Sequence, residues 1–170
     1  MEEILTLKSN KSGQLWAGDP EAWKRLCEKD GCPYCQQGKP PESLIVCETP
    51  LIWLCGGPEP ALPGYVCLIC KDHVVEPYEL SPEKQAEFWQ DCMLVARGVA
   101  TALEPVKINY EIHGNTVPHL HMHVYPRSPG DVYVGYPVHN RARFSRSQEE
   151  LDKITRGIQE ELKGNGRLAN

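Results

Sequence analysis

Three histidines alternate with apolar residues in the segment 118–127, at positions 119, 121 and 123. Successive side chains of a β-strand point to opposite faces, so on a strand His119, His121 and His123 share one face. The Cα atoms of neighbouring histidines would then lie about 6.6–7 Å apart, from a rise of roughly 3.3 Å per residue. Neighbouring imidazoles could therefore contact one anionic group or one metal ion.

Substitution at phosphorus needs a nucleophile that is neutral near pH 7. It also needs a hydrogen-bond donor for the negative charge that develops on the phosphate oxygens. Imidazole meets both needs, because it titrates near neutrality and attacks phosphorus to form a phosphoramidate. A neighbouring imidazole such as His123 can donate to a non-bridging oxygen while His121 attacks. Asn115 and Thr116 stand just before the histidines and offer an amide and a hydroxyl for a phosphate or a leaving group.

In a second interpretation the same residues are metal ligands. His119, His121 and His123 could be the ligands of a metal-dependent hydrolase or oxygenase, since His-x-His on a strand can chelate. Such sites commonly add a carboxylate ligand, and residues 124–129 contain no acidic residue. Both interpretations stay open from the residues alone.

A pair of cysteines, Cys32 and Cys35, lies in a segment with proline and flanking glycines. This turn chemistry suits a knuckle that directs two thiolates toward one point, although a redox motif has the same spacing. His73, at the end of an apolar run, and His119 are suitably placed to complete a Cys₂His₂ zinc site. Four protein ligands leave no open position, so this zinc would be structural.

The composition is that of an ordinary globular protein. The chain has 170 residues, of which 41% are hydrophobic and 24% charged, with a net charge of −5 and a pI near 5.7. These values fit one domain and argue against nucleic acid as a partner. No apolar run approaches the roughly 20 residues of a membrane span, and no signal-like segment is present, so we expect no membrane partner, a cytoplasmic location and eight reduced cysteines.

The pattern along the chain predicts an N-terminal arm over 1–18, one domain over 19–163 and a loose tail over 164–170. Helix signals open at Asp19-Pro20, at Ser81-Pro82 and at Ser147. Strand-like stretches alternate with turn residues between them. The expected elements are helices from 20 to near 31, over 82–103 and over 148–162, and strands over 43–48, 51–55, 65–70, 107–113 and 119–125.

The last two strands could pair as an antiparallel hairpin, which would place Asn109 or Glu111 on the face of the histidine row. We nevertheless interpret Glu111 and His113 as solvated surface residues. Arg127 could contact a phosphate or pair with a nearby acid such as Asp131.

The histidine segment resembles a known family. The run His119–Tyr125 matches the pattern His-φ-His-φ-His-φ-φ, where φ is apolar, of the histidine triad (HIT) superfamily. Pro126-Arg127 is similar too, and residues 109–118 resemble a bacterial branch with Gly-Asn-x-x-Pro before the triad. Gly64–His73 and the Cys32/Cys35 pair resemble zinc-containing members, so the resemblance spans about residues 30–130.

The resemblance implies an α+β fold in which an antiparallel sheet of about five strands is flanked by helices, usually in a homodimer. It also implies hydrolysis or transfer of nucleoside monophosphate groups from dinucleoside polyphosphates or nucleoside phosphoramidates. By position it makes His121 the nucleophile that is nucleotidylated and His123 a phosphate-binding partner. It makes His119 either an orienting residue or a zinc ligand together with Cys32, Cys35 and His73. It also implies that Asn109 and Thr116 contact the phosphate or the leaving group.

The sequence departs from this pattern at residues 51–55. Many nucleotide-binding members carry an acidic residue there for the ribose hydroxyls, and this chain has none. Ribose recognition is therefore open, and a non-catalytic nucleotide sensor is a third interpretation.

Overall fold

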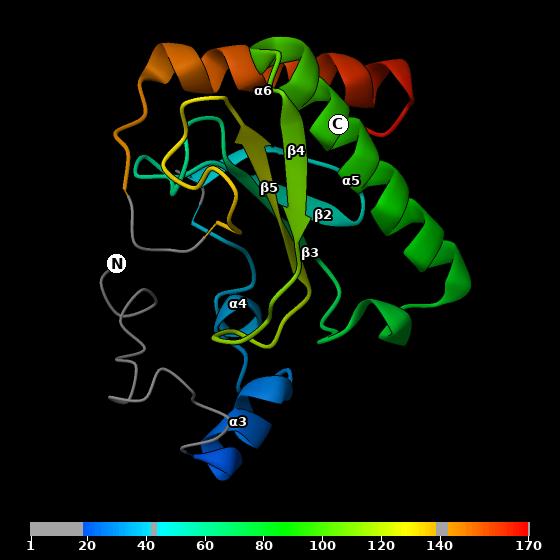
Figure 1. Cartoon of the computed structure of the whole chain (residues 1–170). Helices are drawn as coiled ribbons and strands as arrows, with labels where there is room; N and C mark the ends of the chain where they lie inside the picture. Colours follow the sequence, from blue (N-terminus) through cyan, green and yellow to red (C-terminus); the bar gives the residue numbers. More distant parts are fainter. Residues whose placement is uncertain (1–18, 42–43, 139–142, 170) are drawn as a thin grey trace.

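A five-stranded antiparallel sheet forms the centre of the computed structural model, which describes residues 19–41, 44–138 and 143–169 (Figure 1). The strand order is β1-β2-β3-β5-β4, so β5 lies between β3 and the edge strand β4. The predicted α+β fold is confirmed, whereas the predicted arm 1–18 lies outside the described residues. The strands are β1 (Ile45–Glu48), β2 (Ile52–Cys55), β3 (Val66–Cys70), β4 (Lys107–Glu111) and β5 (His121–Arg127).

Two long helices, α5 (Pro82–Leu103) and α6 (Gln148–Gly164), pack together on one side of the sheet (Figure 1). Both start as the sequence predicts, because the Ser81 hydroxyl accepts from the Lys84 amide and the Ser147 hydroxyl from the Glu150 amide. The short helices α3 (Pro20–Cys27) and α4 (Pro33–Gln36) lie away from this pair, at the end of the sheet (Figure 1).

The contact between α5 and α6 is close because glycines meet there. A Cβ added to Gly98 would lie 2.5 Å from the Cα of Ile158 and 2.7 Å from the carbonyl oxygen of Gly157. The core beneath these helices includes the residues that alternate with the histidines. Its members include Phe88, Val95, Val99, Leu120, Met122, Val124, Ile154, Ile158 and Leu162.

The C-terminal segment is attached to the body of the protein. Arg167 donates from Nε and Nη2 to the two carboxylate oxygens of Asp91, at 2.7 and 3.1 Å, and the Ala169 amide donates to the Glu48 carbonyl at 3.0 Å. Asp91 is 0% exposed and also accepts from the Thr49 hydroxyl at 2.5 Å. A buried carboxylate needs such partners, so the predicted loose tail is wrong for residues 164–169.

None of the helices in the described part of the chain combines the length and the apolar character that crossing a membrane requires.

Candidate functional site

The histidine row begins just before β5 and continues into it. β5 starts at His121, and the alternating residues Leu120 and Met122 lie in the core that α5 and α6 cover. His121 and His123 therefore face the opposite side of the sheet. His123 is paired with Cys67 of β3 and with Glu111 of the edge strand β4, so the row lies on the open face one strand in from the edge of the sheet.

The ring of His121 is fixed in one tautomer. Its Nδ1 lies 2.6 Å from the backbone carbonyl oxygen of His119. Since a carbonyl only accepts, Nδ1 carries the proton and Nε2 keeps its lone pair. Burial lowers the pKa of His121, which favours the neutral ring. The geometry thus presents a neutral imidazole whose free nitrogen is Nε2.

The ring of His123 is arranged the other way round. Its Nδ1 lies 2.8 Å from the hydroxyl oxygen of Tyr65. Burial, reinforced by His121 and His113, lowers the pKa of His123 to about 3, and burial raises the pKa of Tyr65, so both groups are neutral at pH 7. A phenol is the better donor and imidazole the better acceptor, so Tyr65 donates to Nδ1 and Nε2 carries the proton.

The two rings meet edge to face, with centroids 4.9 Å apart. Tyr65 is held by stacking on Tyr125, with ring centroids at 4.8 Å and planes inclined by 19°. One histidine therefore offers a lone pair, while its neighbour offers an N–H group. This is the combination needed to attack a phosphorus atom and to stabilise the charge on its oxygens.

Tyr65 was not singled out from the sequence. Its hydroxyl reaches His123 only because β3 pairs with β5, and the two residues are 58 positions apart. Glu111 and His113 were interpreted as surface residues, yet they are joined to each other at 2.9 Å beside the row. The alternation of residues 107–113 already places both side chains on the face of the histidine row, and this pattern could have identified them as neighbours of the site.

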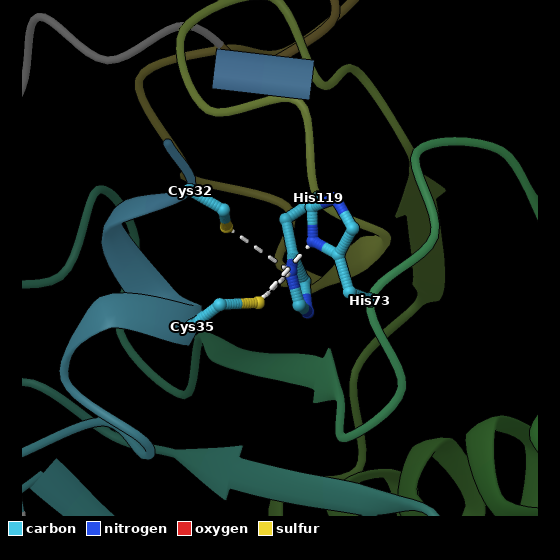
Figure 2. Close-up of side chains that lie close together, drawn as sticks. All are labelled: Cys32, Cys35, His73 and His119. Carbon is cyan, nitrogen blue, oxygen red and sulfur yellow. Dashed lines mark hydrogen bonds between the residues drawn. The ribbon is translucent and has the colours of Figure 1, made fainter. Parts of the chain in front are cut away.

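A second cluster gathers Cys32, Cys35, His73 and His119 (Figure 2). Figure 2 shows their side chains pointing toward one another, and all four ligand atoms lie within 4.8 Å of each other. Cys32 Sγ is 3.4 Å from His119 Nδ1, Cys35 Sγ is 3.2 Å from His73 Nδ1, and Cys35 Sγ is 3.7 Å from His119 Nδ1.

These distances suit a tetrahedral zinc ion. Zn–S and Zn–N bonds of about 2.3 and 2.0–2.1 Å imply sulfur-to-nitrogen edges of roughly 3.6 Å. Both histidines donate Nε2–H to backbone carbonyls, His73 to Cys27 at 2.9 Å and His119 to Cys70 at 2.7 Å. Each Nδ1 therefore directs a lone pair into the cluster, and the donor set fits the metal.

The cluster is built on a turn that also contacts His121. Pro33 opens α4, and the Gln36 amide donates to the Cys32 carbonyl at 3.0 Å, which brings the two thiols together. Between them, Tyr34 sets its ring edge to face against His119 and His121, at 5.4 and 6.4 Å. His119 thus serves both centres, with its side chain in the cluster and its carbonyl on His121.

The predicted phosphate contacts are spread over the face. Asn115 lines a hollow of about 360 Å³ together with Trp23, Glu76, His113 and His119. Asn109 is paired with Tyr125, four residues from His121 along β5, which is about 13 Å at 3.3 Å per residue. Thr116 is exposed in the connection before His119. Asn115 therefore shares a hollow with His119, whereas Asn109 lies four residues along the strand from His121.

Of the two interpretations of Arg127, the structure shows the pair with Asp131. Its guanidinium binds Asp131 through Nε at 2.7 Å and Nη2 at 3.0 Å, and it donates to the carbonyls of Tyr133 and Tyr136 at 2.5 and 3.1 Å. Four of its five N–H groups are used in this way. Arg127 therefore holds the loop that follows β5.

An antiparallel sheet whose inner strand carries alternating histidines is the arrangement expected of histidine triad proteins. Residues 39–130 match the family model of the HIT domain, and the chain belongs to this family. Among solved structures it resembles a histidine triad protein of Sinorhizobium meliloti 1021, with a TM-score of 0.63 and 28% identity over 70% of this chain and 89% of the other.

Three further similarities concern one zinc-bound structure and two curated relatives. A Zn-bound histidine triad family protein of Mycobacterium smegmatis shares the fold, with a TM-score of 0.55 and 22% identity over 82% of this chain and 98% of the other. A bifunctional bis(5′-adenosyl)-triphosphatase/adenylylsulfatase of Arabidopsis thaliana is 26% identical over 66% of this chain and 68% of its own length. A bis(5′-adenosyl)-triphosphatase of Dictyostelium discoideum is 28% identical over 56% and 69%.

Proposed function

We propose that this protein is an enzyme that cleaves a phosphoanhydride or phosphoramidate at the α-phosphate of a nucleotide. The reaction runs through a covalent nucleotidyl-His121 intermediate, which water hydrolyses or another acceptor takes up. The observation that carries this proposal is the 2.6 Å contact between His121 Nδ1 and the His119 carbonyl, because it leaves Nε2 as a neutral nucleophile.

The first step forms a bond between His121 Nε2 and phosphorus and breaks the bond to the leaving group. Negative charge grows on the non-bridging oxygens as this happens. His123 donates its Nε2–H to one of them, which stabilises the transition state more than the ground state. In the second step a water oxygen bonds to phosphorus, and the electron pair of the P–N bond returns to His121.

Zinc, when bound by Cys32, Cys35, His73 and His119, would supply a fixed tetrahedral anchor and no open coordination site. Its contribution would be mechanical, because it would fix the position of His119, whose backbone carbonyl orients His121. The reaction steps belong to the imidazoles.

The names of the relatives in Arabidopsis and Dictyostelium point to dinucleoside polyphosphates such as bis(5′-adenosyl) triphosphate as test substrates. Asn115 and Thr116 are the candidate contacts for the phosphate chain or the leaving group. β2 carries no carboxylate, so ribose is expected to contribute little to affinity. A homodimer in the cytoplasm is part of this proposal, and sedimentation and fractionation test it.

The test is a chemical trap of the intermediate. Brief incubation with a nucleotide substrate labelled at the α-phosphorus, followed by alkaline denaturation, should leave label on the wild-type chain as a phosphoramidate. His121→Ala should carry no label and should lose turnover, whereas His123→Ala should retain label at a reduced rate. Full turnover by His121→Ala would refute the proposal.

The two other interpretations have their own outcomes. A metal held by His119, His121 and His123 is disfavoured, since His119 Nδ1 faces the thiols and His121 Nδ1 faces a carbonyl. It would be supported if His121→Ala lost metal while Cys32→Ser kept it. A nucleotide sensor would bind tightly and turn over none of a panel of phosphoanhydrides and phosphoramidates.

A further inference from the structure

Glu111 and His113 form a hydrogen-bonded pair on the open face of the sheet. His113 Nε2 lies 2.9 Å from Glu111 Oε2. A carboxylate only accepts, so Nε2 carries the proton, and Nδ1 is the nitrogen that can gain or release one. In the part of the chain that the structure describes, Nδ1 has no hydrogen-bond partner.

The carboxylate of this pair is well fixed. Its side chain is 11% exposed, and its second oxygen accepts from the Val138 amide at 3.4 Å. Glu111 is also the direct cross-strand partner of His123. The pair is therefore anchored to the strand that carries the nucleophile, and a fixed carboxylate orients the imidazole bound to it.

His113 lies close to both functional histidines. Continuing the β4–β5 register from Glu111 and His123 brings His113 level with His121. The centroids of the His113 and His123 rings are 5.9 Å apart. The positive charge of a protonated His113 contributes to lowering the pKa of both His121 and His123, which agrees with this proximity.

His113 differs from those two rings in its access to solvent. Its side chain is 49% exposed, whereas His121 is 9% exposed. It lines the hollow that contains Asn115 and also the neighbouring hollow that contains Asn109. Water and a departing group can therefore reach His113 more easily than they can reach the buried ring of His121.

We propose that His113, oriented by Glu111, is the general acid and general base of the reaction at His121. When the bond from phosphorus to the leaving oxygen or nitrogen breaks, that atom takes the electron pair and the Nδ1 proton of protonated His113. When water then attacks the nucleotidyl-His121, its proton passes to the now neutral Nδ1 while the P–N electron pair returns to His121. One proton is given and one recovered, so the cycle balances.

This assignment rests on the proposed function, and the experiment separates the two. It compares the wild type, His113→Gln and Glu111→Gln on two esters of one nucleoside monophosphate. The p-nitrophenyl ester has a leaving group that needs no proton, and an alkyl ester has one that does. Rapid-quench kinetics measure the first release of the leaving group and the steady state, and labelled protein measures the intermediate.

With the p-nitrophenyl ester, His113→Gln should release p-nitrophenol in a first burst as fast as the wild type, because this step needs no proton. Labelled protein should then accumulate, and steady-state turnover should be about a hundredfold slower than in the wild type. This factor is at the low end of the 10²–10⁴ typical of a lost acid–base group. With the alkyl ester the first step itself should slow by a similar factor. Glu111→Gln, which keeps an acceptor but loses the charge, should show the same pattern with a smaller slowing of about tenfold.

Turnover of both esters by His113→Gln within twofold of the wild type would overturn the assignment, as would an equal slowing of both with no accumulated intermediate. His113→Asn is the second variant, and unchanged thermal unfolding of either variant controls for folding. If the wild type itself gives neither burst nor labelled protein, the proposed function fails, whatever His113 does.

Discussion

Loss of one zinc ligand should act on stability first. We expect Cys32→Ser to bind zinc far more weakly, because a serine hydroxyl does not replace a thiolate as a zinc ligand. If the wild type is saturated about 1,000-fold above its dissociation constant, losing the metal costs about 4 kcal/mol. For a chain of this size, roughly 2–4 °C per kcal/mol gives a fall of roughly 8–16 °C in Tm.

The assay combines metal analysis with thermal unfolding of the purified protein. Cys27→Ser is the matched control, because Cys27 is a free cysteine whose backbone carbonyl, and not its thiol, contacts His73. The control should keep one zinc per chain and the wild-type Tm. Well below its own Tm, Cys32→Ser should retain part of the activity. A Cys32→Ser protein with full zinc content, or with a Tm within 2 °C of the wild type, would contradict the tetrahedral site.

Three further substitutions test other contacts. Tyr65→Phe removes the donor to His123 Nδ1 but keeps the ring, so kcat should fall about tenfold with little change in KM. The ¹⁵N signal of His123 Nδ1 should shift in this variant, whereas the control Tyr125→Phe should leave that signal in place. Arg167→Ala leaves the buried Asp91 carboxylate without its charged partner, so the free energy of unfolding measured with denaturant should fall by about 3–5 kcal/mol. A fall below about 1 kcal/mol would mean that the pair contributes little to stability. Gly98→Ala should separate α5 from α6 and lower the free energy of unfolding by roughly 1–3 kcal/mol, with Gly164→Ala, where a Cβ meets open space, as the control.

The features that the sequence predicted correctly depend on local periodicity. Alternation in 119–125 placed Leu120 and Met122 in the core and the histidines on the other face, and proline and serine marked the starts of α5 and α6. The gathering of Cys32 and Cys35 was also predictable, because their turn residues bring both thiols to one side, where they meet His73 and His119. These inferences need only neighbouring residues.

The features that were missed or left open depend on contacts that the linear pattern does not fix. For Arg127 the sequence left Asp131 and a phosphate as alternatives, because nothing local decides between them until the loop 128–136 folds over the guanidinium. The tail was predicted to be loose because its attachment needs Asp91, an acidic residue on the buried side of a helix. The contact of Tyr65 with His123 likewise requires the register of β3 against β5.

The opposite tautomers of His121 and His123 show why two identical side chains can take different roles. Each ring uses Nδ1 for support and presents Nε2 to the open face, but one support is an acceptor and the other a donor. Replacing the His119 carbonyl by a donor, or the Tyr65 hydroxyl by an acceptor, would reverse the assignment at that ring. The different roles of the two rings are therefore set by the neighbours of the row, and the Cys/His cluster takes part through the backbone of His119.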